Sequence, residues 1–175
     1  DLALGSINIA LMDFPNNSKL LYSRSMLLDK AGRLDEMEED LRTILKTEPD
    51  NAVALNALGY TLADKTSRLM EAFDLISKAH QLNPNNPAIL DSMGWVYYRM
   101  GNLEKSIEYL RLAYSQFPDP EVAAHLGEVL WQSGDKDGAL ALWRESLKKE
   151  SSNTIVQDTM KRLGASISAE QPAEQ

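Results

Sequence analysis

Cysteine is absent from this 175-residue sequence, and histidine occurs only twice. A chain without thiols forms neither disulfides nor thiolate-bound metal centres. Apolar runs are short, and the N-terminal residues lack the pattern of a signal peptide. Disulfide scaffolds and thiolate metal sites are therefore excluded, and no direct membrane span is expected in this stretch of chain.

Basic residues are in the minority, with 18 Lys and Arg against 26 Asp and Glu and a net charge of −8. Binding to a phosphate backbone needs clustered positive charge, so nucleic acid is not expected as a partner. The motifs GxGxxG, GxxxxGK, GxSxG and HExxH are also missing. We expect no enzymatic activity, no catalytic residue, no cofactor and no metal site.

The remaining polar candidates have ordinary interpretations. His80 is expected near the C-terminus of a helix, where a cationic ring suits the helix dipole. His125 is expected close to a groove edge, and a surface histidine is favoured there over a pH-sensitive contact. The acidic run "DEMEED", Asp35 to Asp40, predicts a solvated helix face, because a helix spreads oxygen ligands too far apart for a metal ion.

Proline marks a repeat. Pro15, Pro49, Pro84 and Pro118 are separated by 34, 35 and 34 residues, and each lies in a similar turn: "FPNN", "EPDN", "NPNN" and "FPDP". Between these turns the apolar residues follow helical spacing, for example Leu90, Met93, Gly94 and Tyr97 at i, i+3, i+4 and i+7. Two helices per repeat, with a short turn between them, predict an all-α chain of helix hairpins.

The residues at fixed positions within each repeat resemble those of the tetratricopeptide repeat (TPR) family. The unit from Pro87 matches best, and the units from Ala52 and Pro120 also fit the family pattern; the unit from Ser18 is weaker. The matching residues are Gly94, Tyr97, Gly101, Ser106, Ala113 and Pro118; Gly59, Leu62, Ala72, Ala79 and Pro84; and Gly127, Leu130, Gly134, Ala139 and Trp143. The resemblance implies a right-handed superhelical solenoid of antiparallel hairpins that binds protein or peptide segments in a concave groove.

The repeat boundaries predict the organisation of the chain. Full repeats are expected at 18–51, 52–86, 87–119 and 120–153. Residues 1–17 fit the second helix and turn of a truncated preceding repeat, so we expect a fragment of a longer array. Residues 154–164 predict a capping helix that covers the last hairpin with Ile155, Met160 and Leu163, and residues 165–175 are expected to be disordered. About nine to eleven helices follow from this organisation.

One stripe of each first helix is not needed for hairpin packing. In the helix from Ala88 to Met100, Asp91, Trp95 and Tyr98 lie at i, i+4 and i+7. The same offsets in the other repeats predict a partner-binding groove lined by Tyr22, Met26, Asn56, Tyr60, Asp91, Trp95, Tyr98, Arg99, Glu128 and Trp131. Trp95 and Trp131 are the strongest candidates for ligand contact, and Tyr60 fits packing equally well. The acidic Asp91 and Glu128 favour a neutral or basic segment.

An alternative function is structural. If a preceding repeat is missing, its removal exposes apolar surface on Ile7, Leu11 and Leu21, and such surface favours self-association. In this case the chain spaces or dimerises a larger protein whose partners bind elsewhere.

Two longer strings resemble a narrower group. "ALGYTLADKTSRLMEAFDLISKAHQLNPNNPAILDSMGWVYYRMG" and "PDPEVAAHLGEVLWQSGD" are similar to the C-terminal repeats of proteobacterial cell-envelope TPR lipoproteins. Some of these lipoproteins are adaptors that bring cell-wall hydrolases to a carboxyl-terminal processing protease. The resemblance implies such an adaptor, with the protease and its hydrolase substrates as partners. It also implies a periplasmic location at the outer membrane; a cytoplasmic location is the alternative.

Overall fold

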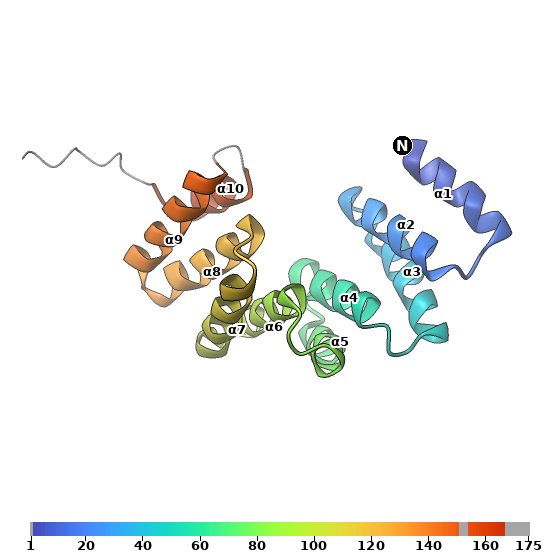
Figure 1. Ribbon diagram of the computed structural model, residues 1–175, viewed down its shortest axis with the longest axis horizontal. Coiled ribbons are helices and arrows are strands. Elements are labelled where there is room, and N and C mark those ends of the chain that lie inside the picture. Colours follow the sequence, from blue (N-terminus) through green and yellow to red (C-terminus); the bar gives the residue numbers. More distant parts are fainter. Residues whose placement is uncertain (1, 151–153, 167–175) are drawn as a thin grey trace, which may run out of the picture. The chain divides into compact units, whose positions relative to one another are not determined.

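The computed structural model describes residues 2–150 and 154–166, and these residues form ten α-helices and no β-strand (Figure 1). The all-α class is confirmed. The helices are α1 (Leu2–Asp13), α2 (Ser18–Lys30), α3 (Leu34–Thr47), α4 (Ala52–Lys65), α5 (Leu69–Leu82), α6 (Pro87–Arg99), α7 (Leu103–Gln116), α8 (Pro120–Ser133), α9 (Lys136–Lys149) and α10 (Thr154–Arg162). Most of the tail predicted to be disordered, together with residues 151–153, lies outside the described residues.

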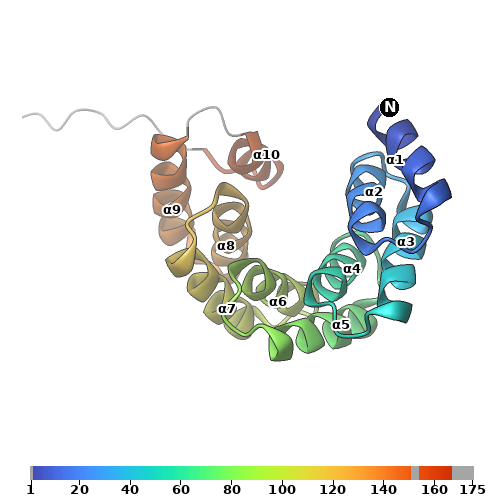
Figure 2. The same ribbon diagram turned by 45° about the vertical axis from the view of Figure 1, so that its right-hand side comes forward.

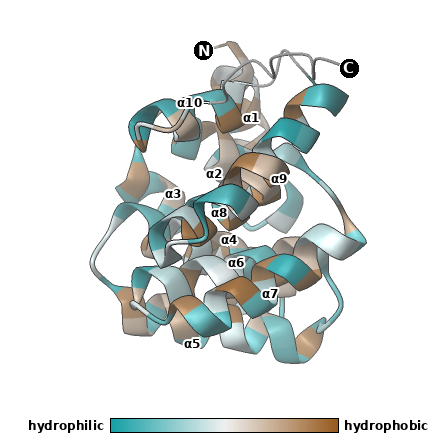
Figure 3. Ribbon diagram, turned by 90° about the vertical axis from the view of Figure 1, so that its left-hand side faces the viewer, coloured by the Kyte–Doolittle hydropathy of each residue, from teal (hydrophilic) through white to brown (hydrophobic). Residues whose placement is uncertain are grey.

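The chain divides into two compact units, Asp1–Asn85 and Asn86–Gln175. Unit 1 contains α1 and the hairpins α2/α3 and α4/α5, and unit 2 contains the hairpins α6/α7 and α8/α9 followed by α10. Single helices such as α7 carry both hydrophilic and hydrophobic residues (Figure 3). Each hairpin buries the apolar stripes of its two helices against each other.

Side-chain caps explain where the first helices begin. Asn17 accepts a hydrogen bond from the Leu20 amide, Asn51 from the Ala54 amide, and Asp119 from the Glu121 amide. Asn86 caps α6 in the same way, and Pro87 occupies its first turn. The Asn or Asp that follows each repeating proline is therefore the N-cap of the next first helix.

Helix pairs cross most closely where the first helix carries glycine. At Gly94 of α6, an added Cβ atom would lie 2.5 Å from Cγ of Leu110 and 3.1 Å from the carbonyl oxygen of Ser106, both in α7. Gly59 of α4 meets Ile76 in the same way. Only a residue without a side chain allows this approach, so these glycines set the spacing of the hairpins.

Gly94→Ala is expected to destabilise the chain by about 1–2 kcal/mol, although alanine is the better helix former. The Ser106 carbonyl belongs to the backbone, so α7 must move to make room. Gly5→Ala in α1 is the matched control, because nothing lies within 4 Å of its added Cβ. This control should stabilise the chain by up to about 1 kcal/mol. Urea denaturation followed by circular dichroism measures both changes, and equal effects of the two substitutions would contradict this explanation of Gly94.

The two ends of the chain differ in detail from the sequence prediction. In α10 the buried side chains are Val156, Thr159 and Met160, whereas Ile155 is 44% exposed. The predicted covering role of Ile155 is therefore wrong, because the helix is rotated by about one residue position. Met160 is buried as predicted, and Leu163 is half-buried.

The prediction of exposed apolar surface is wrong for Leu11 of α1 and Leu21 of α2, whereas Ile7 of α1 is half-buried. Leu11 and Leu21 are buried, because α1 packs on α2. The exposed apolar side chains of α1 are instead Leu2, Ile9 and Met12. The exposed face of α1 thus differs from the predicted one.

Candidate functional site

Trp95 in α6 is covered by its neighbours. Its side chain leaves the residue 7% exposed, and its ring stacks on His125 of α8 with 4.2 Å between ring centroids and 24° between planes. Tyr98 adds a tilted contact at 5.1 Å. The prediction that this indole lies open for a partner is therefore wrong, since α6 and α8 are neighbours in unit 2 and His125 fills the space between them.

Asp91 and His125 form a buried pair. Nδ1 of His125 lies 3.0 and 2.9 Å from the two carboxylate oxygens of Asp91, and the residues are 9% and 7% exposed, respectively. An Nδ1–H group of His125 that donates to the carboxylate gives both side chains a buried hydrogen-bond partner. The prediction of a surface histidine at position 125 is wrong. Asp91 is also not presented to a partner, because its charge faces this ring.

Glu128 of α8 is 4% exposed and has two donors within unit 2. The Tyr98 hydroxyl donates to Oε1 at 3.1 Å. From α10, Arg162 donates to the same oxygen through Nη1 at 2.9 Å and to Oε2 through Nη2. Burial, with the Glu128 carboxylate close by, raises the pKa of Tyr98 to about 12. The basic group predicted to face Glu128 is present, but it belongs to the chain itself.

The other predicted residues of unit 2 keep some exposed surface. Trp131 is half-buried, lies 6.0 Å from the ring of Trp143, and has the Lys136 ammonium 4.9 Å from its ring centroid. Tyr98 and Arg99 are also half-buried. The stripe predicted in unit 2 is therefore divided into a buried part, with Asp91, Trp95 and Glu128, and a partly accessible part.

In unit 1, the four predicted groove residues Tyr22, Met26, Asn56 and Tyr60 are all half-buried. Tyr22 lines a hollow of about 340 Å³ between α2, α3 and α4. The lining residues are Ser18, Lys19, Tyr22, Ser23, Ile44, Asn51, Val53 and Ala54. Val53 is 57% exposed, so an apolar side chain remains open at the edge of this hollow. Val53 was not predicted, although it lies one residue after the start of α4 and next to the groove stripe.

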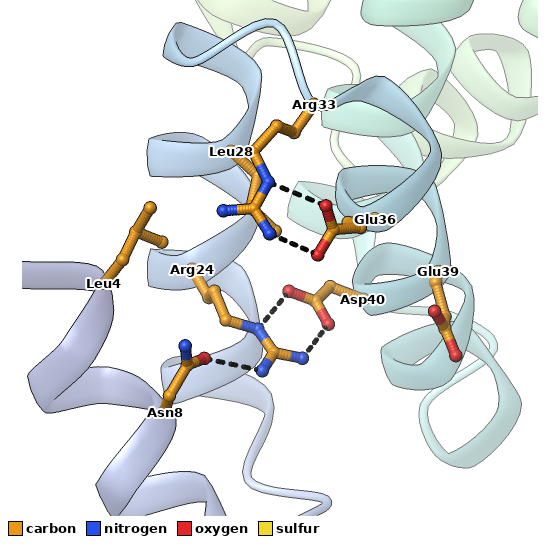
Figure 4. A pocket seen from close by; sticks show the side chains of 8 residues that line it. All are labelled: Leu4, Asn8, Arg24, Leu28, Arg33, Glu36, Glu39 and Asp40. Atoms are coloured by element: carbon orange, nitrogen blue, oxygen red, sulfur yellow. Dashed lines mark hydrogen bonds and ion pairs between the residues drawn. The ribbon is translucent and has the colours of Figure 1, made fainter. Parts of the chain in front are cut away.

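A polar cluster between α1, α2 and α3 was also missed (Figure 4). Arg24 donates to both oxygens of Asp40, through Nε at 2.8 Å and Nη2 at 2.6 Å, and through Nη1 to Oδ1 of Asn8 at 2.9 Å. The hydrogen bond to Asp40 raises the pKa of Arg24 above its ordinary value. The prediction of a solvated acidic face is wrong for Asp40, which is 2% exposed. The burial of Asp40 could have been predicted from its position between Met37 and Ile44 in the buried stripe of α3.

Two features are not found among the described residues. Among the described residues, no group of three or more His, Asp or Glu side chains is placed to hold a metal ion. None of the ten helices is both long and apolar enough to cross a membrane. The described residues include a hollow with an apolar edge in unit 1 and the buried carboxylates of Asp91 and Glu128 in unit 2.

Comparison with family models gives two matches, both described as tetratricopeptide repeat, to residues 18–51 and 92–153. Together they cover more than half of the chain. The TPR repeat-containing protein PA4667 of Pseudomonas aeruginosa is 58% identical over 123 residues, which is 70% of this chain and 21% of that protein. The chain spans between about a tenth and a quarter of the length of the curated relatives it matches.

Solved structures share the fold. TTC0263, a thermophilic TPR protein of Thermus thermophilus, has a TM-score of 0.79 and 22% identity, and the match covers 92% of this chain and 87% of that one. YrrB, a TPR protein with an unusual peptide-binding site, has a TM-score of 0.62 and 18% identity, with 89% and 82% of the two chains covered. At these identities, the likeness establishes the helix-hairpin fold.

Proposed function

The chain belongs to the tetratricopeptide repeat family, whose modules are scaffolds for protein–protein interaction, and we propose that it binds a segment of a partner protein at the hollow of unit 1. The observation that carries the proposal is the 340 Å³ hollow between α2, α3 and α4. The Tyr22 ring and the exposed Val53 lie at this hollow, and Ser23 and Lys19 supply polar groups. An apolar anchor surrounded by polar groups is the usual composition of an interface core.

The position of the hollow supports a protein ligand over a small molecule. Its residues come from the first turns of α2 and α4, two first helices of adjacent repeats, and from the end of α3. The peptide-binding site of YrrB, another TPR protein, is consistent with a peptide ligand.

The narrower proposal concerns the whole protein. We infer an adaptor of the cell envelope that presents cell-wall hydrolases to a carboxyl-terminal processing protease, with a periplasmic location at the outer membrane. Its support is the resemblance of residues 57–101 and 118–135 to envelope lipoprotein repeats. A cytoplasmic adaptor is the rival.

A photo-crosslinking amino acid at position 53 tests the binding site. We expect it to capture a specific envelope protein, whereas the same group at position 70, on an exposed methionine of α5, does not. Val53→Asp and Tyr22→Ala should each weaken binding of the captured protein by about 2 kcal/mol, or roughly 30-fold. Val53→Asp should leave the unfolding curve almost unchanged, because Val53 is exposed.

Two outcomes would contradict this proposal. Equal capture at positions 53 and 70 would show that the hollow is not selective. If a crosslinker at position 9 of α1 captured a second copy of the chain while position 53 captured no protein, the structural alternative would be favoured. The exposed Leu2, Ile9 and Met12 are the surface that such self-association would use.

A further inference from the structure

Helix α10 does not continue the stack of repeats. In unit 2, α8 packs more extensively on α7, the second helix of the preceding hairpin, than on α6. A further first helix would pack on α9 in the same way. Instead, α10 packs more extensively on α8 than on α9 (Figure 2). It therefore covers part of the first-helix face of α8, the face on which the groove was predicted.

The apolar contact of α10 is made mainly by Val156 and Met160, which are buried. Val156 and Met160 join the core cluster formed with Leu126, Val129 and Leu130 of α8. Ile155 is exposed, and the helix is only nine residues long. Isolated helices of this length are marginal in water, so α10 depends on the surface of α8 for its conformation.

The two charged side chains of this contact differ in their exposure to solvent. The Glu128 side chain is 5% exposed, whereas the Arg162 side chain that pairs with it is 57% exposed. A carboxylate this buried needs donors, and Tyr98 supplies one from α6. The acceptor, Glu128, thus belongs to α8 and has one donor from α6, whereas the matching cation comes from the short helix α10.

We propose that the surface beneath α10, hereafter the α8 seat (Glu128 of α8, Tyr98 of α6 and the buried α8 side chains in the same core cluster as Val156 and Met160), is a second protein-binding site that α10 occupies as an internal ligand. The ligand class is a short amphipathic helix. It carries apolar residues at i and i+4 and an arginine at i+6, as Val156, Met160 and Arg162 do in α10. Such a partner helix binds by displacing α10. The α8 seat lies in unit 2 and stands independently of the hollow in unit 1.

A peptide with the sequence of residues 154–166, carrying a fluorophore, is the probe. It is titrated by anisotropy into the full chain and into the full-chain double variant Met160→Asp/Arg162→Glu, which releases α10. We expect the double variant to bind the peptide at least tenfold more tightly than the wild type, because its seat is vacated. A probe carrying Arg162→Glu should bind at least tenfold more weakly than the unmodified probe.

Charge variants on α8 identify the site. In the double variant, adding Glu128→Gln should weaken peptide binding at least tenfold, whereas Glu121→Gln, an exposed carboxylate of the same helix, should not. Val53→Asp should have no effect, which separates this proposal from the one for unit 1. A folded double variant that does not bind the peptide would overturn the proposal. A double variant that no longer unfolds cooperatively would overturn it too, since α10 would then be an integral part of the fold.

Discussion

Trp143→Ala is expected to lower the free energy of unfolding of unit 2 by about 3–5 kcal/mol. Trp143 of α9 is completely buried and is the largest of the fully buried side chains. Its indole packs directly against Gly127 of α8, where a Cβ atom would collide with it. Truncation to alanine removes this ring and leaves a cavity between α8 and α9. Urea denaturation followed by tryptophan fluorescence and circular dichroism measures the loss.

Two controls separate packing from other effects. Nε1 of Trp143 has no hydrogen-bond partner among the described residues, so Trp143→Phe loses volume but no hydrogen bond and should cost less than the alanine variant. Trp131→Ala, which removes a half-buried indole from the same hairpin, should cost about 1–2 kcal/mol. Equal losses for Trp143→Ala and Trp131→Ala would contradict the packing described for the α8/α9 hairpin.

Arg24→Met is expected to destabilise unit 1 by about 3 kcal/mol. The Asp40 side chain is 3% exposed, and the substitution leaves its charge without the guanidinium that binds both of its oxygens. Asn8 loses its hydrogen bond to Arg24 at the same time. The double variant Arg24→Met/Asp40→Leu should recover most of the loss, because no buried charge remains unpaired. Urea denaturation of the two single variants and the double variant completes a double-mutant cycle.

Arg33→Met is the matched control within the same cluster (Figure 4). Arg33 pairs with Glu36, but both side chains are about half exposed, so this substitution should barely move the unfolding curve. A loss for Arg33→Met as large as that for Arg24→Met would contradict the role given to burial. So would a double variant as unstable as Arg24→Met.

Trp95 is buried, so substitution of this residue tests packing rather than ligand contact. Trp95→Ala removes a ring stacked on His125 beside the Asp91–His125 pair, so it is expected to reduce the stability of unit 2. A loss of binding in this variant would not identify a ligand contact. Tyr22 and Val53 are better test positions, because Val53 is exposed and both residues line the hollow.

The helix hairpins were predictable from the sequence because their signals are local. The asparagines after the repeating prolines cap helices, and Gly94 allows the close crossing of α6 and α7, as the spacing indicated. Trp95 stacks on His125, so its side chain faces the neighbouring first helix α8. The spacing within α6 did not predict that His125 of α8 covers this face.

The side chains that cover the predicted groove residues of unit 2 were not predictable, because they come from outside the repeat they cover. His125 lies 34 residues after Asp91, and Arg162 lies 34 residues after Glu128. The spacing of residues within one helix predicts the face on which each side chain lies. It does not predict which side chain of the next helix will contact that face. In α10, a helix of nine residues, the apolar Ile155 and Val156 are adjacent, so a rotation by one residue position decides which is buried.

Hydrogen exchange of the chain, measured alone and bound to the protein captured at position 53, tests the central claim that first-helix faces bind partners. The account predicts increased protection in the first turns of α2 and α4, where the hollow lies. If the partner also uses the α8 seat, α10 should lose protection on binding. Protection confined to the second helices α5, α7 and α9, with α2 and α4 unchanged, would contradict the account.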